Sequence, residues 1–233
     1  MPQPKPHIQY EDMRKDIHRG EILEHLERIR HEFADSFEFL RKYPKSVTIF
    51  GSSQIGPESE VYKQATELAY RISKETSYAI LTGGGPGTME AANKGAFDAG
   101  GKSLGFNISL PHNHTSNEYM TENLKFSYFF ARKAMMTFTA EAYVFLPGGF
   151  GTFDELFSVL TLIQTGKIPR VPVILFNSLF WNEVREFLKK TMLNEFHTIK
   201  ERDLELFTIV DSVDQALDII KNAPVSEWWR NIN

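Results

Sequence analysis

The sequence predicts an α/β fold with a doubly wound, mainly parallel sheet and helices on both faces, which is a Rossmann-like arrangement with an extra N-terminal helix. Short apolar segments alternate with longer amphipathic ones from residue 46 onward. The apolar segments are continuous, as expected for parallel strands that are buried on both faces. A length of 233 residues, with no internal repeat or linker-like stretch, suits one such domain.

The N-terminal region differs in pattern from the rest of the chain. Its first dozen residues contain three prolines and no periodicity, which is typical of a loose tail. Apolar residues from Ile17 to Leu40 then recur at steps of three, four and five, which predicts an amphipathic helix that ends near Tyr43 and Pro44. We therefore expect a tail and helix over residues 1–45 and a Rossmann-like domain over 46–233. The simplest role for this helix is packing against a neighbouring surface.

The domain itself begins with strand, helix, strand, helix and strand. The expected elements are a strand in 46–53, a helix over 58–76, a strand in 78–84, a helix in 89–100 and a strand in 102–110. The second half continues with strands in 124–129, 143–149, 171–177 and 206–210, and helices in 131–140, 153–165, 180–193 and 212–222. Ser212 and Gln215 have the spacing of a capping box at the start of the last helix.

Composition excludes several classes of function. The chain has 26 basic and 30 acidic residues, a net charge of -4, so it lacks the basic field that non-specific nucleic-acid or anionic-lipid binding needs. With no cysteine it has no disulfide, thiolate metal site or cysteine nucleophile. No apolar run approaches the ~18 residues of a membrane span, and the first residues lack the apolar core of a signal peptide. We therefore expect a cytoplasmic protein with no nucleic-acid or membrane partner.

Two glycine-rich segments connect expected strands to expected helices. They are residues 82–90, TGGGPGTME, and residues 147–155, PGGFGTFDE, and a third small-residue turn, Gly51-Ser52-Ser53, follows the first strand. Ligands of open parallel sheets bind beyond the carboxyl ends of the strands, where helix N-termini present free amides and a positive dipole. Glycine serves turn geometry alone in many such connections. Three turns of this kind in one sheet favour a phosphate-binding site.

Known phosphate motifs do not fit these loops. Neither ends in the Gly-Lys-Ser/Thr of a Walker A motif. The dinucleotide fingerprint requires a third glycine where Glu90 and Asp154 stand. The sequence therefore excludes an NTP-hydrolysing P-loop and argues against a standard NAD-binding turn.

Charged residues near the loops have alternative interpretations. Thr152 and Glu155 have capping-box spacing, so Glu155 is either a structural cap or a catalytic acid. Arg132 and Lys133 are adjacent bases near an expected helix start, where they oppose the dipole, so they are either solvated or functional. His112 and His114 have no nearby paired carboxylate, so we expect no metal site.

The two glycine loops, with Ala-Arg-Lys at 131–133 between them, resemble the LOG family, named for the Lonely Guy cytokinin-activating enzymes of plants. Every fixed position of the family motif P-G-G-x-G-T-x-x-E is present, and the resemblance covers roughly residues 46–222. It implies a phosphoribohydrolase that splits nucleoside 5'-monophosphates into free base and ribose 5-phosphate, without a cofactor. Older descriptions of the family as lysine decarboxylases find no support in this sequence, because no lysine stands in a recognisable pyridoxal-phosphate context.

The resemblance also assigns residues. It implies that Glu155 and Arg132 are catalytic. It implies a phosphate cradle made of Gly148, Gly149, Gly151 and Thr152. It implies further substrate-binding residues at the first loop, which are Gly84, Gly85, Gly87 and Glu90. From their positions near the loops, we add Lys133 and Ser52 to this substrate-binding set. The sequence departs from the family's L-P-x-E-Q pattern, because Asn113 and His114 replace the acid and the amide.

These residues suit the implied reaction. Loss of a base from a ribosyl carbon passes through an oxocarbenium-like state, which a carboxylate stabilises. We therefore expect a nucleotide glycosidase with AMP or N6-modified AMP as substrate, and the resemblance implies a homodimer or a larger homo-oligomer. The alternatives are a non-catalytic nucleotide sensor or carrier on the same scaffold, and an enzyme of sugar phosphates that ignores the base.

Overall fold

The computed structural model describes residues 19–109, 116–138 and 140–226, with side chains from residue 22 onward. Its centre is a seven-stranded, fully parallel sheet in the order β4-β3-β2-β1-β5-β6-β7. The strands are β1 (Ser46–Phe50), β2 (Ala79–Thr82), β3 (Ser103–Ile108), β4 (Glu122–Phe126), β5 (Ala140–Phe145), β6 (Val173–Phe176) and β7 (Thr208–Val210). The predicted doubly wound parallel fold is confirmed.

The order of the strands creates a crevice at the centre of the sheet. The chain runs outward from β1 to β4, returns to pair β5 with β1, and then runs outward in the other direction. The loops after β1 and β5 therefore leave the sheet toward opposite faces. This switch point is where ligands of doubly wound sheets bind.

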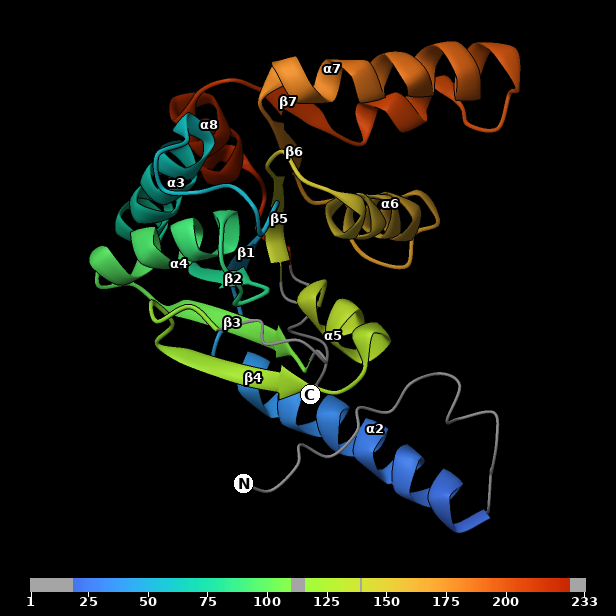
Figure 1. Cartoon of the computed structure of the whole chain (residues 1–233). Helices are drawn as coiled ribbons and strands as arrows, with labels where there is room; N and C mark the ends of the chain where they lie inside the picture. Colours follow the sequence, from blue (N-terminus) through green and yellow to red (C-terminus); the bar gives the residue numbers. More distant parts are fainter. Residues whose placement is uncertain (1–18, 110–115, 139, 227–233) are drawn as a thin grey trace.

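Helices cover both faces of the sheet (Figure 1). One face carries α3 (Glu60–Thr76), α4 (Thr88–Asp98) and α8 (Val213–Asn222), and the other carries α5 (Phe129–Met136), α6 (Phe150–Gln164) and α7 (Ser178–Phe187). A π-helical segment (Leu188–Glu195) extends α7, and a short 3-10 helix (Glu201–Glu205) precedes β7. Among the described helices, none is long and apolar enough to cross a membrane.

Two apolar cores hold the layers together, because successive strand residues point to opposite faces. In β1, Val47 and Ile49 pack with α3, α4 and α8, whereas Phe50 packs with the helices of the other face. All three side chains are buried, which explains the continuous apolar pattern of the strands.

The N-terminal helix α2 (Arg19–Arg41) joins the core on the face of α5, α6 and α7 through its C-terminal end. Phe39 and Leu40 are buried among strand and α5 side chains. Its middle is tied to the β4–α5 connection, where the Ser127 amide donates to Glu32 Oε1 at 2.6 Å. The other end of α2 extends beyond the sheet (Figure 1), and Leu23 and Leu26 are exposed there.

Helix boundaries follow local capping. Ser59 caps α3 by accepting a hydrogen bond from the Val61 amide, and the predicted capping box of Ser212 and Gln215 opens α8. Among the helix starts that differ from the prediction, two bear on the site: α5 begins at Phe129 rather than 131, and α6 begins at Phe150 rather than 153. The N-cap residue is Tyr128 in α5 and Gly149 in α6, and neither forms a side-chain capping hydrogen bond.

Candidate active site

A cavity of about 810 Å³ opens at the carboxyl edge of the sheet, over the switch point. This volume lies within the range of small-molecule sites. The loops after β1, β2, β3 and β5 and the first turns of α5 and α6 form its wall. The residues that line the cavity are 50–54, Gly83, Gly85, Pro86, Met89, 107–109, Ser116, Lys125, Phe129, Arg132, 149–152, Asp154 and Glu155.

The N-terminus of α6 supplies free amides to this cavity. Gly149 is the N-cap residue and contributes no side-chain cap, so the amides of residues 150–152 have no intrahelical acceptor. Gly149, Gly151 and Thr152 line the cavity, as the phosphate-cradle assignment requires. Gly148 lies behind them, and a Cβ there would collide with Thr152 Oγ1.

The capping-box interpretation of Thr152 and Glu155 is wrong. Because α6 begins at Phe150, Thr152 is the third helical residue and cannot act as the N-cap. Both side chains are instead buried at the cavity. Glu155 therefore has no capping role.

Ser52 connects the loops around the switch point. Its amide donates to the Pro147 carbonyl at 3.2 Å, and its own carbonyl accepts from the Thr88 amide at 3.0 Å. Gly87, with a φ of +75°, approaches that carbonyl so closely that a Cβ would collide with it. Ser52 lines the cavity, whereas Gly87 shapes the loop without lining it.

Side chains from other elements hold the carbonyls of the first glycine loop. An Arg132 Nη donates to the Gly83 carbonyl at 3.4 Å, Asn107 Nδ2 to that of Gly84 at 3.1 Å, and Asn117 Nδ2 to that of Gly85 at 3.0 Å. Of these glycines, Gly85 and Gly83 line the cavity, and Gly84 supports the turn with a φ of +68°. The position of the loop is thus fixed by three polar side chains.

Glu155 lies about one and a half turns into α6 and is only 8% exposed. Its Oε2 is buried and has no hydrogen-bond partner among the described residues. Burial raises the pKa of Glu155 from 4.5 to about 7, although the charges of Lys133 and Arg132 act in the opposite direction. A carboxyl group that titrates near neutral pH in a cavity is suited to acid–base or charge-stabilising chemistry.

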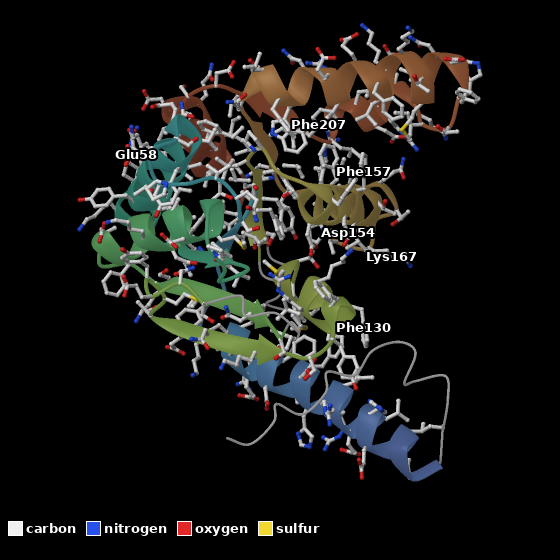
Figure 2. All side chains as sticks on the ribbon, viewed as in Figure 1. Glu58, Phe130, Asp154, Phe157, Lys167 and Phe207 are labelled. Atoms are coloured by element: carbon white, nitrogen blue, oxygen red, sulfur yellow. The ribbon has the colours of Figure 1, made fainter. Side chains whose placement is uncertain are left out.

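Arg132 lies on α5 and is partly buried in the cavity wall. Its Nε donates to the Phe106 carbonyl at 2.7 Å, and burial lowers its pKa. The neighbouring Lys133 does not line the cavity. It forms an ion pair with Asp154, and its Nζ donates to Ser158 Oγ at 3.3 Å. Figure 2 shows Asp154 on the side of α6 that faces α5.

Glu90 is not brought to the cavity. It lies on α4 and accepts a hydrogen bond from the Tyr62 hydroxyl of α3 at 2.9 Å. This acid therefore links two helices on one face of the sheet, and the structure does not support a direct contact of Glu90 with substrate.

Some predicted features lie outside the described residues, namely His112, Asn113 and His114. In the described ranges, no group of three His, Asp or Glu side chains is arranged to hold a metal ion.

Sequence reasoning missed several residues at the site. Asn107 lies on β3 and Asn117 in the connection to β4, and neither belongs to a recognisable motif. Phe129 and Phe150 begin α5 and α6 and stand at the cavity, where Phe150 is 97% exposed. A polar residue inside an otherwise apolar strand, as in SLGFNI, was the available signal for Asn107.

Comparisons with known proteins agree with this architecture. Residues 89–220 match the family described as "possible lysine decarboxylase". The cytokinin riboside 5'-monophosphate phosphoribohydrolase LOG2 of Arabidopsis thaliana is 31% identical over 150 residues, which cover 64% of this chain and 70% of that protein. The enzyme of the same name from Rhodococcoides fascians is 26% identical over 163 residues, covering 68% and 81%.

Solved structures share the fold. A molybdenum cofactor binding protein from Rippkaea orientalis has a TM-score of 0.54 and 23% identity over 76% of this chain and 94% of its own. The molybdenum cofactor carrier protein of Chlamydomonas reinhardtii has a TM-score of 0.55 and 22% identity over 77% and 97%. From the motif, the family match and the curated relatives together, the chain belongs to the LOG family.

Proposed function

We propose that this protein hydrolyses the N-glycosidic bond of nucleoside 5'-monophosphates, with AMP or N6-modified AMP as substrate, and releases free base and ribose 5-phosphate. The observation that carries the proposal is the buried carboxyl group of Glu155. One of its oxygens has no partner within the described part of the chain, and Glu155 lies on the helix whose N-terminal amides face the same cavity. The names of the curated relatives agree with this activity.

The phosphate would bind at the start of α6. The amides of residues 150–152 and the helix dipole favour an anion there, and Ser52 adds a hydroxyl from the facing loop. Glu155 follows about one and a half turns later on the same helix, which leaves room for the ribose between the phosphate and the carboxylate. Phosphate binding then positions the carbon that reacts.

The ionised Glu155 would stabilise positive charge on the sugar and orient the attacking water. In the reaction, the bond between C1' and the base nitrogen breaks, and its electron pair stays with the base. Water oxygen bonds to C1' and one of its protons passes to Glu155, while the base nitrogen takes up a proton from solvent. Glu155 then returns its proton to solvent, so that one water is consumed in total. Arg132 lies close enough to influence the pKa of Glu155 and holds the first glycine loop.

A non-catalytic nucleotide sensor or carrier is the second candidate, and it rests on the shared scaffold of the cofactor carriers. Their identity to this chain is under 25%, so they inform the fold alone. A carrier has no need of a carboxylate beside an anion site, because that charge repels the ligand's phosphate. The position of Glu155 at the cavity therefore favours the hydrolase.

The test is incubation of the purified protein with AMP, GMP, CMP, UMP and isopentenyladenosine monophosphate, with free base measured by chromatography. Glu155→Gln should lower the rate on the order of 10²- to 10⁴-fold. Glu90→Gln is the matched control, because Glu90 also lies on a helix that follows a glycine loop but is outside the cavity. Saturable binding of nucleotide without base release would instead support the sensor or carrier.

We also propose that the protein forms a homodimer or a larger homo-oligomer. Leu23 and Leu26 on α2 and Phe130 on α5 are large, exposed apolar side chains, and α2 packs against α5. Sedimentation velocity of the full chain tests this, and Leu23→Glu with Leu26→Glu should shift the distribution toward monomer. A monomeric wild type would contradict the proposal.

A further inference from the structure

Asn107 is a buried amide at the end of β3 that the predicted site does not include. It is 9% exposed and lines the cavity. Its Nδ2 donates to the Gly84 carbonyl at 3.1 Å and to Ser116 Oγ at 3.0 Å. A side-chain amide has two N–H donors, so both are used and the orientation of the group is fixed.

The other end of this amide is its carbonyl oxygen, Oδ1. Asn107 Oδ1 is buried and has no hydrogen-bond partner among the described residues. Buried acceptors are nearly always paired, because burying one without a donor is unfavourable. Since Nδ2 is fully engaged, Asn107 offers a ligand one acceptor and no donor. It would therefore favour a group that carries an N–H or O–H.

The position of Asn107 indicates which part of a nucleotide it meets. The sheet order is β3-β2-β1-β5, so β3 is three strand spacings, or about 14 Å, from the strand that leads into α6. A phosphate at the N-terminus of α6 is too distant to meet Asn107 directly. The base is the part of a nucleoside monophosphate farthest from the phosphate, and apolar Pro86 and Met89 line the cavity from the neighbouring loop.

We propose that Asn107 selects the nucleobase, with its Oδ1 accepting a hydrogen bond from an exocyclic amino group such as the 6-amino group of adenine. This inference rests on the proposed nucleotide substrate and adds a specificity-determining residue to it. A singly N6-substituted adenine keeps one N–H and remains acceptable. A 6-oxo purine places an acceptor against an acceptor and is disfavoured.

The test compares AMP with three analogues: the 5'-monophosphate of purine riboside, which lacks the amino group, inosine 5'-monophosphate and 2'-deoxy-AMP. The wild type should prefer AMP over the first two by about 10- to 100-fold in kcat/KM. In Asn107→Leu this preference should fall to near unity. The ratio separates recognition from structural damage, because a displaced loop slows all four substrates together.

Asn117→Leu is the matched control. Asn117 is a second buried asparagine that holds the same loop, through the Gly85 carbonyl, but it does not line the cavity. Its loss should lower the rates while leaving the ratio between AMP and its analogues intact. The dissociation constants of the same nucleotides from Glu155→Gln, with and without Asn107→Leu, should give the same pattern without turnover.

The outcomes distinguish the two proposals. Absence of base release by the wild type would refute the hydrolase, while a binding ratio that falls on loss of Asn107 would still support base selection. The proposal that Asn107 selects the base would be overturned if the wild type did not prefer AMP over the two purine analogues. It would also be overturned if Asn107→Leu kept that preference. Discrimination against 2'-deoxy-AMP that alone disappears in Asn107→Leu would also overturn it, because the donor would then be the ribose.

Discussion

Replacing Glu155 by glutamine should stabilise the protein at alkaline pH. Burial raises the pKa of Glu155 from 4.5 to about 7. Below pH 4.5 both the folded and unfolded states hold the proton, so the group contributes nothing to pH dependence. Between pH 4.5 and about 7 the unfolded chain releases the proton while the native state keeps it, so the free energy of unfolding falls. Above pH 7 the loss is complete.

The magnitude follows from the shift in pKa. Each unit corresponds to 1.36 kcal/mol, so ionised Glu155 costs about 3 kcal/mol of stability at pH 8. Glutamine does not ionise, and the free-energy difference between Glu155→Gln and wild type should therefore grow by about that amount from pH 4.5 to pH 8. For a chain of this length, 3 kcal/mol corresponds to roughly 6–12 °C in Tm.

Urea unfolding of both proteins at several pH values, followed by tryptophan fluorescence and circular dichroism, measures this difference. Packing of the new amide can change the free energy of unfolding by an amount that does not depend on pH. This amount cancels, because the comparison uses only the change of the free-energy difference with pH. Asp154→Asn is the control, since Asp154 is a neighbouring carboxylate that is mostly exposed and ion-paired with Lys133. Parallel stability curves for wild type and Glu155→Gln across this range would refute a raised pKa of Glu155.

Three further predictions concern activity. The kcat/KM of the wild type should rise with pH through about 7, because catalysis needs ionised Glu155. A pH–rate profile whose only rise lies near pH 6, where the substrate phosphate titrates, would contradict this. Lys133→Met should move this rise in kcat/KM to higher pH, because the Lys133 charge lowers the pKa of Glu155. A pH–rate profile identical to that of wild type would argue against this coupling. In steady-state assays, Gly148→Ala should raise KM more than about 10-fold, because the new Cβ collides with Thr152 and displaces the start of α6. Gly56→Ala is the control and should leave KM unchanged, because the space around Gly56 is open.

Much of the fold was predictable because its signals are local. Continuous apolar strands and amphipathic helices predicted the parallel sheet, and Ser212 with Gln215 predicted the start of α8. The starts of α5 and α6 were placed too late because both helices begin without a capping side chain, at Phe129 and Phe150. Strand order is a non-local property, and only the position of the glycine loops hinted at the switch point.

The candidate site was predictable where a motif carries it. Glu155, Arg132 and the glycines of the second loop were found from spacing and resemblance, and all but Gly148 among them contact the cavity. Glu90 was misjudged because proximity in sequence to a glycine loop does not fix the direction of a helical side chain, and it points to Tyr62. Asn107 was missed because its importance arises from contacts with Gly84 and Ser116, which are distant in sequence.

The pairing of β1 with β5 has a consequence for synthesis of the chain. Val47 lies beside Ala142, which is 95 residues later, and every strand from β2 to β4 is made in the interval. At 5–20 residues per second, β1 leaves the ribosome about 5–20 s before its partner. During that time one edge of β1 offers unpaired backbone groups to other chains. A chain halted before β5 would therefore expose an unpaired strand edge and lack the part of the cavity wall that α6 supplies. Translational pauses in this interval should therefore promote aggregation.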